Sequence, residues 1–426
     1  MLTIAYLANQ FPSAVEPYVS EEIRELRRQG LNVIPGSVRQ PDLLQRLSSE
    51  GMSRSSILCL QPVRVRTLLQ ALLLAATRWR EISSLLARIL LQGNESPGRR
   101  MRALLHTWLG AYYAVLLQEC AVDHIHVHHG YFGSWIAMVA ARLLGISFSL
   151  TLRGSDLLLH PLYLDTKLKN CRYCVTISEY NRRNILDHFP GIDPRKIIVS
   201  RLGVDPFLAT NVSRSSAPTP QSGFTLLAVG RLHAVKDHAF LVRACARLRD
   251  TGLDFQCAIA GEGPERQRLR LLIRDYRLEG HVTLLGHIAR EAMDALYRDA
   301  QVVVLTSVSE GIPLVLMEAM VRRSIVLAPA ITGVPELIIP GKTGFLYAPG
   351  HLEDFVQRIR FLQFVIHFDD QSSTSRLNWI RHAARVQVLR NFNRELNVNR
   401  FSNALLRMIT PHERSSPYEG PLLQQI

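Results

Sequence analysis

Two carboxylates flank a predicted helix entrance in the C-terminal half of the chain. Glu310 follows a short apolar strand and precedes Gly311-Ile312-Pro313, and Glu318 lies about a turn and a half inside the apolar helix that Pro313 opens. The N–H groups of a helix's first turn, with the positive end of its dipole, can hold an anion or the oxygens of a sugar. The two carboxylates can therefore grip two hydroxyl-bearing parts of one elongated ligand. On spacing alone a simpler interpretation is favoured, in which Glu310 caps the helix and Glu318 is a solvated charge.

A pair of basic residues follows the predicted strand at residues 224–229. Gly230 and Arg231 come directly after this strand, and Lys236 stands a few residues further on. Ligands of parallel α/β units bind beyond the carboxyl ends of the strands, so both side chains are suitably placed. A fixed arginine and a lysine can stabilise a departing diphosphate without a metal, and the chain has no Asp-x-Asp motif for metal chelation. Taken singly, each can also be a solvated charge.

These stretches together resemble the donor-binding half of family 4 glycosyltransferases. The segments that carry the resemblance are Glu310-Gly311-Ile312-Pro313, Glu318-Ala319-Met320, Gly333-Val334-Pro335-Glu336-Leu337 and Gly341-Lys342-Thr343-Gly344-Phe345. Enzymes of that family are retaining and have the GT-B fold. The resemblance therefore implies an α/β protein with two Rossmann-like, doubly wound parallel-sheet domains that face a cleft. It also implies C-terminal helices that cross back to the first domain.

The resemblance implies roles for particular donor-side residues. Glu310 would contact the donor sugar, Glu318 the ribose of the nucleotide, and Arg231 and Lys236 the diphosphate. The donor-binding residues implied are Arg231, Lys236, Gly261, Gly263, Glu310, Gly311, Ile312, Pro313 and Glu318. The residues implied as catalytic are Arg153, Arg231, Lys236 and Glu310.

Strands alternate with helical patterns along most of the chain, which favours parallel sheets covered on both faces. A polar stretch rich in proline and serine before residue 222 is typical of a linker. The predicted organisation is an acceptor-side domain at 1–205 with a basic helical insertion at 62–119, a linker at 206–222, a nucleotide-sugar-binding domain at 223–370, crossover helices at 371–410 and a flexible tail at 411–426.

The first domain carries the implied acceptor side, with Glu16, His128 and Asp156. Arg153 stands where family members commonly have the histidine of a His-Gly-x-Asp motif. An arginine cannot act as a general base at neutral pH, but it can pair bidentately with a carboxylate or a phosphate. We therefore hypothesise that Arg153 recognises an acidic sugar or an acceptor phosphate. The alternative is that the substitution has weakened or abolished transfer and left a non-catalytic protein that binds sugar nucleotides.

Two further departures lie on the donor side. Residues 321–325 include Arg322 and Arg323 where the family usually has a glycine and a proline, and Thr332 replaces the first of two glycines. These changes affect the backbone near the donor sugar more than the nucleotide site.

Histidines alternate along the predicted strand that holds His124, His126 and His128. A His-x-His pair at a strand end can present two imidazoles to one metal, which offers a metal-dependent hydrolase as a competing hypothesis. No later His or Asp set completes such a site at a recognisable spacing. We therefore expect no metal and no cofactor other than the nucleotide-sugar substrate.

Composition limits the possible partners. The 426 residues have a formal net charge of +14, which attracts nucleotide phosphates, acidic lipids or nucleic acid. No nucleic-acid recognition motif is present, so a nucleic-acid partner is not expected. In residues 62–119, apolar helical repeats are laced with arginines. This pattern is typical either of helices at a membrane interface or of a helical pair packed on the first sheet with its arginines in water.

Six scattered cysteines do not make a disulfide scaffold, and Cys171 and Cys174 are better explained as buried thiols than as half of a zinc site. The N-terminus lacks the basic region of a signal peptide, and no apolar run approaches the roughly 20 residues needed to cross a bilayer. We expect a cytoplasmic protein, with peripheral contact to the inner face of the plasma membrane as an open alternative.

The sequence thus predicts a retaining, metal-independent glycosyltransferase that moves a sugar from a UDP- or GDP-linked donor to a hydroxyl on a glycan or lipid-linked acceptor. The resemblance is to bacterial exopolysaccharide and lipid-linked glycan enzymes. The identities of the base, the sugar, the acceptor and the linkage are not encoded in any recognisable motif.

Overall fold

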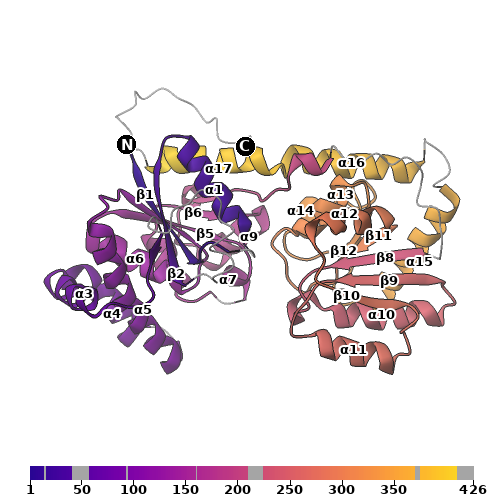
Figure 1. The fold of residues 1–426 in the computed structure, drawn as a ribbon, viewed down its shortest axis with the longest axis horizontal. Coiled ribbons are helices and arrows are strands. Elements are labelled where there is room, and N and C mark those ends of the chain that lie inside the picture. The colour runs from indigo at the N-terminus through magenta and orange to yellow at the C-terminus, as the bar shows by residue number, and fades with distance from the viewer. Residues whose placement is uncertain are drawn as a thin grey trace. The chain divides into compact units, whose positions relative to one another are not determined.

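The computed structural model describes residues 1–13, 16–40, 57–92, 95–159, 161–209, 224–369 and 375–409. It contains two parallel sheets with flanking helices (Figure 1), which confirms the predicted α/β class. The predicted linker falls mainly on residues 210–222, and the predicted tail on 411–426; both lie outside the described residues. Two compact units are formed, one by Met1–Leu150, Thr166–Cys174 and Val398–Ile426, the other by Thr151–Asp165 and Val175–Asn397. The domain boundaries given above remain predictions.

The first sheet has seven strands in the order β3-β2-β1-β4-β5-β6-β7. β1 pairs in parallel with β2 on one side and with β4 on the other. Ile4, Ala5 and Leu7 of β1 are fully buried, as expected of a parallel strand that helices cover on both faces. The strands are β1 (Thr3–Gln10), β2 (Asn32–Arg39), β3 (Leu58–Cys59), β4 (His124–His128), β5 (Ser147–Leu152), β6 (Cys174–Thr176) and β7 (Ile197–Val199).

The arginine-rich stretch at 62–119 forms three helices rather than a pair. The longest of them, α5, packs against α6 at Gly110, where a Cβ atom would lie 2.5 Å from Cβ of Val139. Only glycine permits this approach of the two helices. The helices of this part of the chain are α1 (Pro17–Arg28), α3 (Val65–Thr77), α4 (Trp79–Leu91), α5 (Pro97–Gln118), α6 (Phe132–Leu144), α7 (Ser155–Leu158), α8 (Leu164–Asn170) and α9 (Glu179–His188).

The second sheet has six strands in the order β10-β9-β8-β11-β12-β13, and every neighbouring pair is parallel. The strand order reverses between β8 and β11. In an open parallel sheet this reversal is the place where the loops at the carboxyl ends diverge and a ligand binds. The strands are β8 (Phe224–Val229), β9 (Phe255–Ala260), β10 (Val282–Gly286), β11 (Val302–Val304), β12 (Ile325–Pro329) and β13 (Phe345–Tyr347).

Successive residues of β8 enter different cores, because side chains alternate across a strand. Leu226 lies in the core that contains Leu241 of α10 and Phe355 of α15. Leu227 lies in the core that contains Leu316 of α13. The helices that follow β8 in the chain, up to Asn391, are α10 (His238–Asp250), α11 (Arg266–Asp275), α12 (Arg290–Asp299), α13 (Leu314–Val321), α14 (Val334–Leu337), α15 (Leu352–Asp369) and α16 (Arg376–Asn391).

The crossover helices predicted at 371–410 are α16 and α17 (Arg394–Ile409). The chain leaves the helical conformation at Phe392, where φ is −130° and ψ is 33°. Oδ1 of Asn393 then accepts a hydrogen bond from the N–H of Leu396 at 3.2 Å, which caps the new helix. Phe401 of α17 packs edge-on against His126 of β4, with ring centroids 5.6 Å apart. The C-terminal helix therefore returns to the first unit, as predicted.

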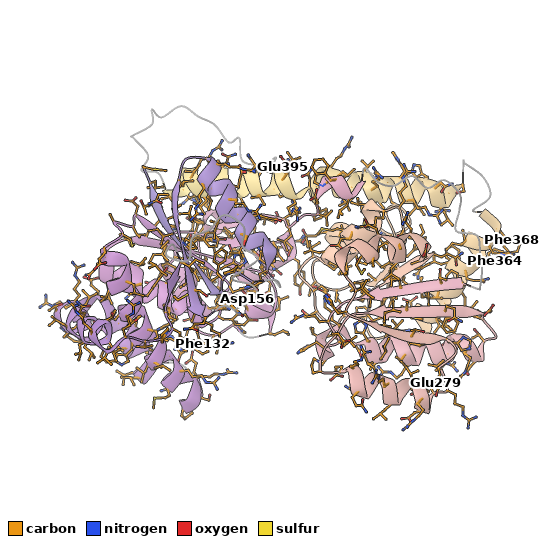
Figure 2. The ribbon with its side chains drawn as sticks, viewed as in Figure 1. Phe132, Asp156, Glu279, Phe364, Phe368 and Glu395 are labelled. Atoms are coloured by element: carbon orange, nitrogen blue, oxygen red, sulfur yellow. The ribbon has the colours of Figure 1, made fainter. Side chains whose placement is uncertain are left out.

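Helix α15 exposes an aromatic stripe at Phe361, Phe364 and Phe368. Figure 2 labels the last two, whose rings lie 4.6 Å apart. Their spacing of three and four residues places all three on one side of the helix, opposite the face that enters the core through Phe355.

Helix α13 ends in a Schellman turn with an unusual residue. The N–H of Arg323 bonds to the carbonyl of Met320 at 3.1 Å, and the N–H of Ser324 bonds to the carbonyl of Ala319 at 3.0 Å. Arg323 has a φ of 62° at the position where such turns favour glycine. Burial, followed by the Arg323 charge, lowers the pKa of Arg385, so two guanidinium groups also repel one another here.

Replacing Arg323 with glycine is expected to raise the free energy of unfolding by about 0.5–1 kcal/mol, because glycine adopts a positive φ without the clash of a Cβ atom. Urea denaturation should show a higher midpoint with an unchanged slope. The matched variant Arg322→Gly should lower the midpoint, since Arg322 has a negative φ and pairs with Asp294. An Arg323→Gly midpoint at or below that of the wild type would contradict this account.

Candidate functional site

The loops that follow β8 and β11 are joined by hydrogen bonds at the point where the strand order reverses. The N–H of Val308 donates to the carbonyl of Val235 at 2.9 Å, and the hydroxyl of Thr306 donates to the carbonyl of Lys236 at 3.0 Å. These bonds fix the turn that carries Lys236 beside the loop that carries Glu310. The site therefore forms because two strands distant in sequence are neighbours in the sheet.

Lys236 and Glu310 form an ion pair inside these loops. Nζ of Lys236 lies 2.5 Å from Oε1 of Glu310, and the hydroxyl of Ser307 donates to the same oxygen at 2.6 Å. The two side chains are only 19% and 11% exposed. Such a half-buried, charge-assisted contact is stronger than an exposed salt bridge. The structure thus brings together two of the predicted donor-site residues.

The entrance of α13 differs in one detail from the prediction. Helix α13 begins at Leu314, so Pro313 is its N-cap residue rather than its first helical residue, and it makes no side-chain cap. The carboxylate of Glu310 accepts from Lys236 and Ser307, which shows that Glu310 is not the helix cap of the simpler interpretation. Gly311 and Ile312 connect this glutamate to the helix.

Glu318 is held by a residue that sequence analysis missed. The buried hydroxyl of Tyr297, on α12, donates to Oε2 of Glu318 at 3.0 Å. Burial, followed by the Glu318 charge, raises the pKa of this tyrosine well above its usual range. The Arg322 guanidinium lies 4.9 Å from the Tyr297 ring centroid and also donates to the carbonyl of Glu318 at 3.0 Å. Glu318 is thus a fixed carboxylate rather than a freely solvated charge.

The loop after β9 packs against the loop after β8. The N–H of Leu232 donates to the carbonyl of Glu262 at 2.8 Å. A Cβ atom on Gly261 would lie 1.9 Å from the carbonyl oxygen of Gly230, so this position requires glycine. Gly263 lies in the same loop and packs on Leu232. Arg231 is exposed beside this junction, and among the described residues its side chain has no ion-pair partner.

A histidine beside the Lys236 turn stays neutral at physiological pH. His238 is the first residue of α10, and the preceding Asp237 caps this helix by accepting from the N–H of Phe240 at 3.1 Å. Burial, followed by the nearby charge of Lys236, lowers the pKa of His238 to about 4. The positive charge of this turn therefore comes from Lys236 and not from His238.

Arg153 and Asp156 lie in the second compact unit, together with Gly311. Oδ1 of Asp156 accepts from the backbone N–H groups of Arg153 and Gly154, at 3.1 and 2.9 Å. The carbonyl of Arg153 accepts from Nδ2 of Asn181 at 3.0 Å. A Cβ atom on Gly311 would lie 2.8 Å from this carbonyl oxygen, so the Arg153 turn and the Glu310 loop are in close contact. Asp156 fixes the turn, and Arg153 is placed beside the predicted donor site.

The predicted acceptor residues Glu16 and His128 lie in the first unit. Oε1 of Glu16 contacts Nε2 of His129. His128 is fully buried, with Nδ1 3.2 Å from the hydroxyl of Tyr6 and 3.6 Å from Oε2 of Glu22. Their contact with an acceptor remains a prediction.

The other β4 histidines are core residues. His124 is hydrogen-bonded to Ser147 and Ser149, both at 2.7 Å, and His126 contacts the Ser149 hydroxyl at 2.8 Å. Within the described ranges, no group of three or more His, Cys, Asp or Glu side chains is arranged to hold a metal ion. The described residues therefore offer no set of metal ligands that would support the competing metal-hydrolase hypothesis. Cys171 and Cys174 are buried, as predicted.

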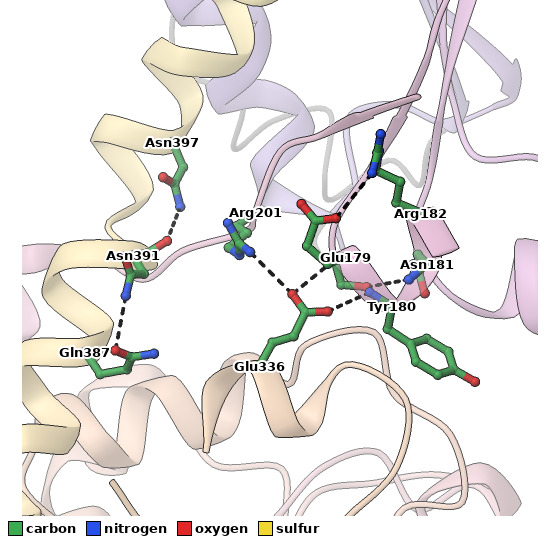
Figure 3. A network of polar contacts seen from close by, with 10 residues as sticks. Glu179, Tyr180, Asn181, Arg182, Arg201, Glu336, Gln387, Asn391 and Asn397 are labelled. Atoms are coloured by element: carbon green, nitrogen blue, oxygen red, sulfur yellow. Dashed lines mark hydrogen bonds and ion pairs between the residues drawn. The ribbon is translucent and has the colours of Figure 1, made fainter. Parts of the chain in front are cut away.

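Glu336 makes a contact that the sequence motif did not reveal. Its carboxylate accepts from the N–H groups of Glu179 and Tyr180, at 3.1 and 2.7 Å, and lies 3.5 Å from Nη2 of Arg201 (Figure 3). The first turn of α9 supplies both N–H groups, whose partial positive charge favours a carboxylate. Glu336 therefore has a structural partner inside the second unit, although only its place in the Gly333–Leu337 string was apparent from the sequence.

Comparisons with known proteins agree with this fold. The structure of a glycosyltransferase from Rickettsia africae matches with a TM-score of 0.69 and 20% identity, over 96% of this chain and 99% of that chain. Anabaena HepE in complex with UDP matches with a TM-score of 0.67 and 17% identity, over 96% of this chain and 100% of that chain. Two parallel-sheet domains with these structural neighbours define the GT-B class of glycosyltransferases.

Sequence comparison identifies the family. A model of glycosyltransferase family 4 matches residues 15–207, and a model of group 1 glycosyl transferases matches residues 210–363. The chain belongs to family 4 of the glycosyltransferases. Salmonella typhimurium WcaL, assigned to colanic acid biosynthesis as a glycosyltransferase, is 32% identical over 225 residues, which are 51% of this chain and 53% of WcaL. The chain thus spans about half the length of the curated relatives that it matches in this way.

The free energy of unfolding is expected to fall as the pH is lowered from about 7 to 5. The folded-state pKa of His238 is about 4, and the pKa of His124 is also lowered well below 6.5, mainly by burial. The unfolded chain takes up these protons near pH 6.5, whereas the folded chain takes them up only at lower pH. The free energy of unfolding is therefore constant above about pH 6.5 with respect to these groups and decreases below it. His238 alone should account for about 2 kcal/mol over this range.

Denaturant titrations at several pH values measure this slope. The variant His238→Asn should flatten it, whereas His188→Asn, at an exposed position on α9, should leave it unchanged. Equal slopes in His238→Asn and the wild type would contradict the assignment.

Proposed function

We propose that this protein transfers a sugar from a nucleotide-sugar donor to a hydroxyl acceptor, with retention of anomeric configuration and without a metal. The observation that carries the proposal is the Lys236–Glu310 pair at the reversal of strand order between β8 and β11. This pair offers a cation for a diphosphate and a carboxylate for sugar hydroxyls within one contact distance. UDP bound to HepE and the biosynthetic assignment of WcaL support a nucleotide-linked donor and a polysaccharide or glycolipid product.

In the proposed reaction the donor's anomeric C–O bond to phosphate breaks while the acceptor oxygen attacks from the same face. The acceptor's proton passes to the departing phosphate oxygen. Arg231 and Lys236 stabilise the charge that develops on the leaving diphosphate, because fixed cations act most strongly where charge appears in the transition state. Glu310 orients the sugar, and Glu318, held by Tyr297, binds the ribose.

The proposed substrate class depends on the guanidinium group of Arg153. The turn that carries it is fixed by Asp156 and lies against Gly311. A guanidinium next to the donor sugar would pair with a carboxylate or a phosphate. We therefore propose an acidic sugar or a phosphate-bearing acceptor as the substrate class. The donor-binding homologue without catalytic activity is the second possibility, and nucleotide binding without turnover would favour it.

Calorimetric titration with UDP and GDP, in the presence of a chelator, tests the donor site. One of the two nucleotides should bind to the wild type, and Arg231→Ala should weaken binding at least tenfold, since a charged contact to phosphate contributes about 1.5–3 kcal/mol. Arg247→Ala is the matched control, because Arg247 is exposed on α10 and paired with Glu353. Failure of both nucleotides to bind the wild type would overturn the proposal, as would binding that the chelator abolishes.

We also propose that the protein works in the cytoplasm on the surface of an anionic membrane. Val65, Leu69 and Leu73 form an exposed stripe on α3, with Leu69 and Leu73 61% and 66% exposed. Met101, Leu105 and Trp108 form a second exposed stripe on α5, which packs against α3. Exposed arginines accompany them at positions 64, 66, 80, 99 and 102. Among the described residues no helix has the length and apolar character needed to span a bilayer.

Flotation with vesicles of phosphatidylglycerol and phosphatidylcholine tests this surface. The wild type should bind the anionic vesicles, and binding should weaken as salt is added. The double variant Leu69→Glu with Leu73→Glu should lose at least tenfold, because each inserted leucine contributes about 1.5–3 kcal/mol. Leu271→Glu, at an exposed position on α11, is the control. Membrane contact would be contradicted if the double variant floated as well as Leu271→Glu, or if the wild type did not float with the anionic vesicles.

A further inference from the structure

Thr332 adopts a backbone conformation that its residue type disfavours. It lies between β12 and α14 and has a φ of 41°. The N–H of Val334 donates to the carbonyl of Ile331 at 2.9 Å, so Thr332 is the first central residue of a tight turn. A positive φ at this position is strongly associated with glycine, and a β-branched residue there is a genuine outlier. Strained residues of this kind persist where the surrounding structure requires them.

The hydroxyl of Thr332 is bonded to both backbone groups of one residue, Glu310. Oγ1 accepts from the N–H of Glu310 at 3.3 Å and donates to the carbonyl of Glu310. The next residue reinforces the contact, because a Cβ atom on Gly333 would lie 2.1 Å from the carbonyl oxygen of Gly311. The turn after β12 therefore packs directly on the loop after β11, and the Thr332 hydroxyl connects the two.

Glu310 is consequently fixed from two sides. Lys236 and Ser307 hold its carboxylate, and Thr332 holds its backbone. The nucleotide side of the site is built from other contacts, namely the Arg231 loop on Gly261 and the Glu318–Tyr297 hydrogen bond. None of the hydrogen bonds found for Thr332 in the described part of the chain reaches those residues.

We propose that Thr332 is a positioning residue, whose hydroxyl holds the Glu310 backbone in the conformation that orients the donor sugar. The unfavourable φ is tolerated because no glycine at this position could supply the two hydrogen bonds. The inference rests on the proposed function in one respect, that the ligand of Glu310 is the sugar of the donor. It makes a prediction that a merely structural role does not, because Thr332→Gly and Thr332→Ala should lose the same activity although they differ in stability.

The test compares Thr332→Gly, Thr332→Ala and Thr332→Ser. Thr332→Gly should unfold at a higher denaturant concentration than Thr332→Ala, because both variants lose the hydroxyl and only glycine relieves the positive φ. Its kcat/KM with the sugar nucleotide should fall about tenfold, because the Glu310 backbone loses both hydrogen bonds of the Thr332 hydroxyl. Its Kd for the free nucleotide should stay within about twofold of the wild type. Thr332→Ala should show the same loss of activity, and Thr332→Ser, which keeps the hydroxyl, should restore most of it.

A second measurement needs no substrate. Amide hydrogen exchange over residues 306–313 should be faster in Thr332→Gly and Thr332→Ala than in the wild type, and unchanged in Thr332→Ser. Exchange that is the same in all four proteins would overturn the inference, as would full activity in Thr332→Gly or loss of activity in Thr332→Ser. If the wild type neither binds a nucleotide nor transfers a sugar, the proposed function fails, and the exchange data still decide whether Thr332 positions the Glu310 loop.

Discussion

The reversal of strand order between β8 and β11 is the constraint on which the site in the second unit depends. Because these two strands are neighbours, the turn with Lys236 and the loop with Glu310 emerge side by side from the same edge of the sheet. Their opposite charges then meet in a half-buried contact, where the attraction is less screened than on the surface. The flanking loops follow from the same geometry, since β9 delivers Gly261 on one side and β12 delivers Thr332 on the other.

Each acidic group of the site is fixed by its own polar partner. Tyr297 donates to Glu318, two backbone N–H groups donate to Asp156, and the first turn of α9 donates to Glu336. A carboxylate fixed in this way loses little conformational freedom when a ligand arrives, so less of the binding energy is lost to ordering. The carboxylates of the candidate site thus already have fixed positions.

Much of the fold could be predicted from local patterns. The strand at Phe224–Val229 was predicted with the bounds observed, because a short apolar run between turn residues is distinctive. The break at Phe392 was not predicted, since the apolar pattern continues across it and only the cap at Asn393 marks the new helix. The division of residues 62–119 into three helices was likewise not predicted, because amphipathic spacing does not specify which face of a helix a neighbouring helix covers.

The site shows the same division between local and long-range information. Glu310, Lys236 and Gly311 could be found from their positions after strands. Tyr297 and Ser307 could not, because an isolated tyrosine or serine has no spacing that links it to a distant carboxylate. The role of Thr332 was hidden for a different reason: its replacement of a glycine was visible, but its hydrogen bonds to Glu310 depend on how two loops pack.

The ion pair of Lys236 and Glu310 also bears on selectivity among anions. Glu310 is the counter-ion of Lys236, so an anion that binds Lys236 has to displace a carboxylate that is already in place. An inorganic phosphate or sulfate ion that took its position would leave Glu310 partly buried beside another negative charge, which is unfavourable. A ligand that carries both a phosphate and adjacent hydroxyl groups satisfies the two side chains at once. The charge balance of this pair therefore disfavours a small anion that brings no hydroxyl groups.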